Sequence, residues 1–108
     1  NYNTEETRRD NITVGISYNA NIKTAKDILL HICEDHPGIL KEPAPSVFVA
    51  NLADSAVELS FRFWTKNEDF WDAHFYVIET LKLEYDKAGI EIPFPQRVIH
   101  TLGNKDLK

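Results

Sequence analysis

The fold of this chain is decided by residues 57–63, Val-Glu-Leu-Ser-Phe-Arg-Phe, in which apolar and polar side chains alternate without a break. A period of two residues is typical of a β-strand with one buried face, so positions 57, 59, 61 and 63 are predicted to face the core. Residues 47–52 form a second apolar stretch, separated from the first by the short connection Ala53-Asp54-Ser55. So short a connection predicts an antiparallel hairpin.

Two predicted helices flank this hairpin, at residues 22–35 and 67–88, where apolar residues recur every three or four positions. Asn21 and Asn67 are the predicted N-caps of these helices. Another alternating stretch, residues 12–18, precedes the first helix and predicts a further strand.

A last short β-type segment at residues 97–101 completes the order β-α-β-β-α-β. We therefore predict an α+β, ferredoxin-like sandwich with both helices on one face of an antiparallel sheet. Its core is predicted to include Val14, Ile16, Leu29, Leu59, Phe61, Val77 and Leu81.

The second helix is rich in aromatic residues. Its apolar stripe is predicted to contain Phe70, Val77, Ile78, Leu81 and Tyr85. Trp71 and Phe75 lie four residues apart and share a helix face, where they either widen this stripe or form an outward patch. Phe48 is a further candidate for exposure. Exposed aromatic residues on an acidic protein would indicate a contact with another protein surface.

Composition limits the classes of function. The 108 residues make one domain that is large enough for a real core. A net charge of −5 and a pI near 5.3 argue against nucleic acid as a partner. The single cysteine, Cys33, excludes an internal disulfide and suits a reducing compartment. Because methionine is absent, we interpret the sequence as a piece of a longer protein.

The best candidate for a metal site is the run His31–His36, but its potential ligands do not share one helix face. Zinc needs three or four convergent ligands. Cys33 is expected to be inert, because the neighbouring carboxylates of Glu34 and Asp35 raise the pKa of a thiol. No glycine-rich phosphate loop is present. We therefore predict no enzyme activity, no catalytic residue, no metal and no cofactor.

The chain leaves the second helix along a stiff path. Gly89 is predicted to end the helix, because glycine adopts the left-handed conformation without steric cost. Pro93 and Pro95 then enforce an extended backbone on either side of Phe94. This path leads away from the domain into the last predicted strand, Arg97–Thr101.

Four stretches of the sequence carry a family resemblance. Ile90–Arg97, Ile-Glu-Ile-Pro-Phe-Pro-Gln-Arg, is similar to the signature that closes the cytoplasmic domain of the small-conductance mechanosensitive channel (MscS) family. Arg8-Arg9-Asp10, followed by Ile12–Tyr18, resembles the strand that leaves its middle β domain. Phe61–Trp64 resembles the end of its third strand, and Leu83–Ile90 its last helix turn. The resemblance covers almost the whole chain.

This resemblance implies part of a channel that opens under membrane tension and releases ions and small solutes during osmotic downshock. In that family seven subunits enclose a hollow cytoplasmic vestibule, and this domain forms its lower wall. The full-length protein would be a homo-oligomer in the inner membrane, held there by helices upstream of Asn1, with this domain in the cytoplasm. The implied division is a linker from an upstream β domain at 1–7, the ferredoxin-like domain at 8–95, and a strand and tail at 96–108.

The resemblance also implies an oligomer interface at the exit, where one strand from each subunit closes a small parallel barrel. The expected interface residues are Pro93, Phe94, Pro95, Arg97, Val98, Ile99, His100 and Thr101. The rival hypothesis is a ferredoxin-like regulatory domain that binds a small molecule, since this fold carries many unrelated functions.

Overall fold

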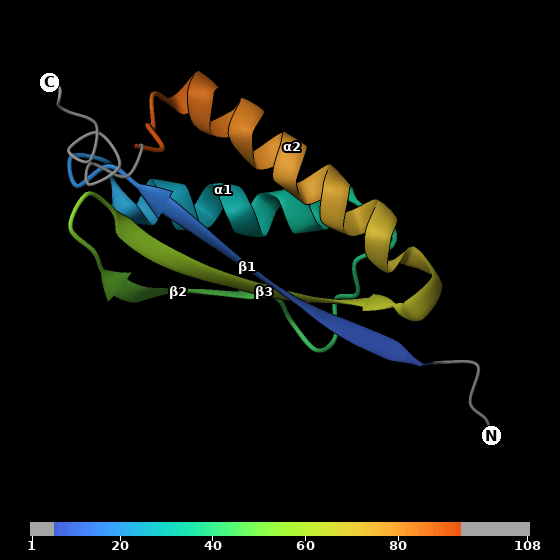
Figure 1. The fold of residues 1–108 in the computed structure, drawn as a ribbon. Helices are drawn as coiled ribbons and strands as arrows, with labels where there is room; N and C mark the ends of the chain where they lie inside the picture. The colour runs from blue at the N-terminus through green and yellow to red at the C-terminus, as the bar shows by residue number, and fades with distance from the viewer. Residues whose placement is uncertain (1–5, 94–108) are drawn as a thin grey trace, which may run out of the picture.

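A computed structural model describes residues 6–93 of the chain. Its elements are the strands β1 (Thr7–Ile16), β2 (Ser46–Leu52) and β3 (Val57–Lys66), the helices α1 (Ile22–Asp35) and α2 (Phe70–Ala88), and a short 3-10 helix, η1 (Asn67–Asp69). Figure 1 shows both helices packed on the same face of the sheet. The predicted α+β class with its two-layer arrangement is therefore confirmed.

Strand β3 occupies the centre of a three-stranded sheet with the order β1-β3-β2. Both neighbours run antiparallel to β3, so β1 and β2 are parallel to each other and α1 connects them. This arrangement is the first part of a ferredoxin-like sheet. The predicted last strand, residues 97–101, lies outside the described residues, and the complete ferredoxin-like order stays a prediction.

The core lies between the inner face of the sheet and the two helices. Phe61 of β3 is fully buried and pairs with Ile12 of β1 on one side and Val47 of β2 on the other. All seven predicted core residues are buried, with at most 7% of their surface exposed. Burying such a side chain contributes about 1.5–3 kcal/mol relative to leaving it in water. The sheet and the helices therefore depend on one another for stability.

Strand β1 begins five residues earlier and ends two residues earlier than the predicted strand at 12–18. The pattern missed its start because Arg8 and Arg9 are exposed and Asp10 carries a charge on the buried face. These residues pair with the end of β3, which runs three residues further than predicted. Tyr18 is left outside the strand, and its hydroxyl donates to a carbonyl oxygen in the loop between β2 and β3.

The two helices begin in different ways. Asn21 caps α1 as predicted, since its side-chain oxygen accepts a hydrogen bond from the N–H of Thr24 at 2.9 Å. The predicted cap of α2, Asn67, is wrong: α2 begins three residues later, after η1, and Asp69 precedes it without a side-chain capping bond. The N–H of Asn67 instead donates to the carbonyl oxygen of Glu6 at 3.0 Å. This bond prolongs the β1–β3 ladder and delays the start of the helix.

Helix α2 buries one stripe and leaves a second apolar stripe outside. The buried stripe consists of Phe70, Ala73, Val77, Leu81 and Tyr85. Ile78 is 43% exposed, so its predicted place in the core is wrong. Each step along a helix turns the side chain by about 100°, which carries Ile78 away from the buried position of Val77. Trp71 and Phe75 are 56% and 62% exposed, so they form an outward patch.

We expect Leu81→Ala to lower the free energy of unfolding by about 2–5 kcal/mol, because it would leave a cavity beneath α2. Leu81 is only 5% exposed. Leu83→Ala is the matched control on the same helix: Leu83 is 53% exposed, and its loss should cost less than about 0.5 kcal/mol. Urea denaturation of the three proteins measures both values. Equal losses for the two variants would contradict the assigned burial.

Candidate functional site

Three exposed apolar side chains, Trp71, Phe75 and Ile78, follow one another along the outer face of α2. We refer to these three residues as the aromatic patch. Their spacing of four and three residues places them in one line along the helix. The rings of Trp71 and Phe75 are stacked, with centroids 5.8 Å apart and planes 28° apart. This line leaves a continuous apolar surface on a helix that already buries another stripe.

The start of β1 reaches the edge of the aromatic patch through Arg8. Its guanidinium carbon lies 3.8 Å from the centroid of the Phe70 ring and 5.8 Å from that of Trp71. The rings of Phe70 and Trp71 are perpendicular, with centroids 5.0 Å apart. A cation over an aromatic face contributes about 0.5–2 kcal/mol. This contact ties the entry of the chain to the first turn of α2.

A buried carboxylate, that of Asp10, lies beneath the aromatic patch and is bonded to His74. Asp10 extends the inward-facing series of β1 and is only 5% exposed, so its carboxylate is largely withdrawn from water. Nδ1 of His74 lies 2.6 Å from its Oδ2 atom. The His74 ring is stacked near Phe70 and meets Trp71 and Phe75 edge to face. A buried carboxylate without a partner is costly, so the Asp10–His74 pair fixes the rotation of α2 and the direction of the patch.

A second histidine–aspartate pair holds the end of α1 against the start of α2. Nε2 of His36 lies 2.9 Å from Oδ2 of Asp72, and Nδ1 accepts a hydrogen bond from the N–H of Gly38 at 2.9 Å. Because Nδ1 is the acceptor, the proton of the neutral ring is on Nε2, which donates to Asp72. The His36 ring also meets Tyr76 edge to face at 4.9 Å. The first half of α2 is thus positioned from both β1 and α1.

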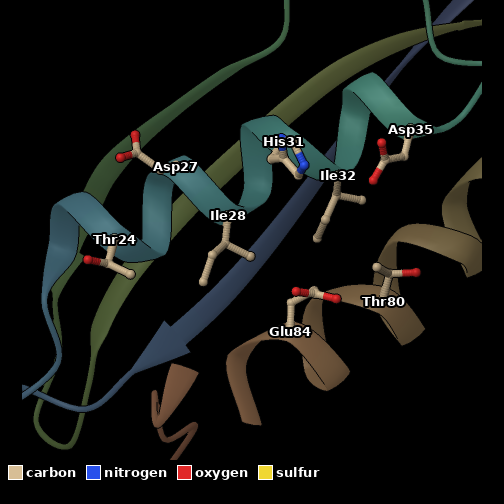
Figure 2. A pocket seen from close by; sticks show the side chains of 8 residues that line it. All are labelled: Thr24, Asp27, Ile28, His31, Ile32, Asp35, Thr80 and Glu84. Carbon is tan, nitrogen blue, oxygen red and sulfur yellow. The ribbon is translucent and has the colours of Figure 1, made fainter. Parts of the chain in front are cut away.

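A groove of about 470 Å³ lies between α1 and α2. Figure 2 shows the side chains that line it. Isoleucine side chains of α1 point into it, and Glu84 faces them from α2. Two of its three carboxylates already have lysine partners: Asp27 lies 2.9 Å from Lys23, and Glu84 lies 3.4 Å from Lys87. A regulatory domain that binds a small molecule would use such a cavity. Little unpaired charge remains here to select a ligand.

The run His31–His36 does not converge on one point. His31 lies on the surface, 3.4 Å from the carboxylate of Glu34, whereas Cys33 is buried and His36 is bonded to α2. Within residues 6–93, no group of three His, Cys, Asp or Glu side chains is arranged to hold a metal ion. Burial, with a smaller effect of the Glu34 carboxylate, raises the pKa of the Cys33 thiol to about 12. The reactive thiolate is therefore scarce at neutral pH.

The expected oligomer interface falls almost wholly outside the described residues. Pro93 is the last residue of that range, and Phe94, Pro95 and Arg97–Thr101 lie beyond it. Sequence reasoning missed both histidine–aspartate pairs. One signal was available, because Asp10 stands two residues before Ile12 and an extended alternation would have placed its carboxylate on the core face.

No helix within residues 6–93 combines the length and the apolar character needed to cross a membrane. The family model "Mechanosensitive ion channel MscS, C-terminal" matches residues 10–92. An uncharacterized MscS family protein of Archaeoglobus fulgidus is 41% identical over 99 residues, which cover 92% of this chain and 35% of that relative. The small-conductance mechanosensitive channel of Edwardsiella ictaluri is 32% identical over 100 residues, covering 93% of this chain and 35% of that channel. The chain thus spans about a third of the length of these relatives.

The fold is also similar to that of a solved structure, the crystal structure of Helicobacter pylori MscS in its closed state. The TM-score is 0.76 at 25% sequence identity, and the similarity covers 82% of this chain and 35% of that chain. The similarities in sequence and in fold agree with each other.

We expect His74→Ala to lower the free energy of unfolding by about 1–3 kcal/mol, because it leaves the buried Asp10 carboxylate without its partner. The control is Lys82→Ala, which breaks the exposed Lys82–Asp86 pair on the same helix and should cost at most about 0.5 kcal/mol. Urea denaturation compares the two. Adding Asp10→Leu to His74→Ala should recover part of the loss, since no buried charge then remains unpaired. Equal costs for the two single variants would show that the Asp10–His74 pair is not important for the fold.

The thiol of Cys33 predicts a pH dependence of stability. Its pKa in the folded protein is about 12, above the ordinary value of 9.0, so the unfolded chain loses the thiol proton first as the pH rises. The stabilisation is therefore complete below pH 9 and declines between pH 9 and 12. Urea denaturation at pH 8 and pH 10 should show a larger loss for the wild type than for Cys33→Ala. An identical loss in both proteins would contradict the burial of this thiol.

Proposed function

Because this chain belongs to the mechanosensitive ion channel MscS family, we propose that it is the C-terminal domain of a channel that opens under membrane tension. Such a channel releases ions and small solutes when a cell meets osmotic downshock. The full-length protein would lie in the inner membrane, with this domain in the cytoplasm as part of the wall of a vestibule.

The observation that carries this proposal is the family match over residues 10–92. It runs from the middle of β1 to just past the end of α2, so it includes the whole core and both histidine–aspartate pairs. The similarity to the fold of a solved MscS channel supports the same conclusion independently of single motifs.

The chain crosses the domain from one end to the other, as we expect for one subunit in the wall of a vestibule. Figure 1 shows that the described chain enters β1 at one end of the domain and leaves α2 near the other. Glu6 is bonded to Asn67 beside the start of α2, whereas Pro93 follows the end of that helix. The 19 residues of α2 alone span about 28 Å. A domain crossed from end to end can connect an upstream segment to a downstream one.

The exit from α2 is fixed by backbone hydrogen bonds. Gly89 has a φ of 75°, the left-handed conformation predicted for it. The N–H of Ile90 then donates to the carbonyl oxygen of Tyr85 at 2.9 Å and closes the helix. The chain next passes the end of β1, where the N–H of Ser17 donates to the carbonyl oxygen of Glu91 at 2.9 Å. The direction of the exit is thus set before Pro93.

From this exit, the following residues would pair with their copies around a symmetry axis and close a ring of seven subunits. The proposed interface consists of Pro93, Phe94, Pro95 and Arg97–Thr101. Val98 and Ile99 are apolar, and a lone strand with such residues would leave an unpaired edge.

Recording from membrane patches under suction tests the channel function of the full-length protein. We expect currents that increase with membrane tension, and we expect the protein to protect channel-deficient cells from osmotic downshock. A protein that inserts into the membrane but passes no tension-dependent current would contradict the proposal.

Deleting residues 97–108 from the full-length protein is expected to weaken the ring and to impair the recovery of the channel after opening. Deleting only residues 102–108 is the matched control, and it should change neither property because the proposed strand at 97–101 remains. Light scattering measures the mass of the assembly, and repeated pressure steps measure recovery. If the longer deletion behaves like the shorter one, the exit segment is not the interface, whatever the recordings show about conduction.

A further inference from the structure

We propose that the aromatic patch of Trp71, Phe75 and Ile78 is the docking surface for the part of the full-length polypeptide that precedes Asn1. This inference rests on the proposed function, because it takes the chain to be one part of a longer channel. It assigns a role to a surface on the first half of α2, whereas Pro93, the first residue of the proposed ring interface, follows the end of that helix.

The first support is the place where the chain enters the domain. The carbonyl oxygen of Glu6 is bonded to Asn67, and the guanidinium of Arg8 covers Phe70 and reaches toward Trp71. The polypeptide upstream of β1 therefore arrives at the first turn of α2, beside the aromatic patch. A covalently attached segment that begins beside the aromatic patch has a high effective concentration there. It therefore competes well with separate proteins for binding to the patch.

The second support is the amount of protein that is available to cover the patch. The relatives from Archaeoglobus fulgidus and Edwardsiella ictaluri extend well beyond the match, which includes only 35% of each. Most of such a protein would lie outside residues 1–108. The family resemblance implies membrane helices upstream of Asn1, and a body of that size could cover three neighbouring side chains on a helix.

The chemistry of the patch defines the surface that fits it. Tryptophan and arginine are among the residues most enriched at the energetic centres of protein contacts. The guanidinium of Arg8 already lies over Phe70 and near Trp71, and the Asp72 carboxylate is bonded to His36. The complementary surface is therefore an apolar pocket that receives the exposed rings.

The patch is also held in place before any partner arrives. The His74 ring contacts the rings of Trp71 and Phe75 edge to face, and it is bonded to the buried carboxylate of Asp10. Side chains that are already ordered lose little conformational freedom on binding. The Asp10–His74 pair thus acts as a positioning element for the docking surface.

Photo-cross-linking in the full-length channel tests this assignment. The photoreactive amino acid p-benzoylphenylalanine replaces Phe75 in one variant and Leu83 in the matched control, because Leu83 is equally accessible but lies on another side of α2. After irradiation and proteolysis, mass spectrometry identifies the attached peptide. We expect position 75 to join a peptide from upstream of Asn1 in a product that keeps the mass of a single subunit on a denaturing gel, and we expect position 83 not to do so. Adding Trp71→Ala should abolish the cross-link from position 75.

Three outcomes would overturn the proposal. The first is a cross-link from position 75 to residues 6–93 of another copy. The second is the absence of any protein cross-link at position 75. The third is a cross-link at position 75 that survives Trp71→Ala. None of these outcomes depends on current, so a channel that conducts normally can still refute the docking surface. Conversely, a protein without tension-dependent current can still show the expected cross-link.

Discussion

Strands β1 and β3 pair residue by residue from Thr7 with Lys66 to Ile16 with Val57, and the rest of the domain is built on this ladder. The register of this ladder sets which face of each strand points toward the helices. A slip of one residue would turn every inward side chain to the other face. The ladder is longer than the apolar pattern that specifies it. Its polar end brings Asp10 beneath α2 and brings the entry of the chain to the start of that helix.

The position of α2 follows from that polar end. Hydrophobic burial orients the helix only loosely, since apolar contacts are not directional. The hydrogen bonds that join Asp10 to His74 and His36 to Asp72, both within the first turns of α2, add direction. The outward stripe of aromatic residues is therefore a consequence of how the inward face is fixed. The buried carboxylate of Asp10 at the edge of the core thus helps to determine which side of α2 faces outward.

The two ends of the described chain are both attached to the core of the domain. The chain enters beside the start of α2 and leaves past the end of β1, where Ser17 and Glu91 are bonded. Entry and exit are thus both attached to the same two elements, the β1–β3 ladder and α2. A force applied between the two ends would act along elements that share one core, in which Leu59, Phe61 and Val77 are fully buried.

The sequence by itself determined the α+β class, the helix at 22–35, the hairpin of β2 and β3 and the core residues, because each depends on local periodicity and turn chemistry. It also determined the left-handed end of α2 at Gly89. Only the tertiary structure decided that β1 starts at Thr7, that Asn67 prolongs the ladder instead of capping a helix, and that Ile78 faces outward. The tertiary structure also decided which residues bond to Asp10 and His36, since these partners are 64 and 36 residues away along the chain. Periodicity reports which face of an element is buried, whereas packing alone determines which element covers it.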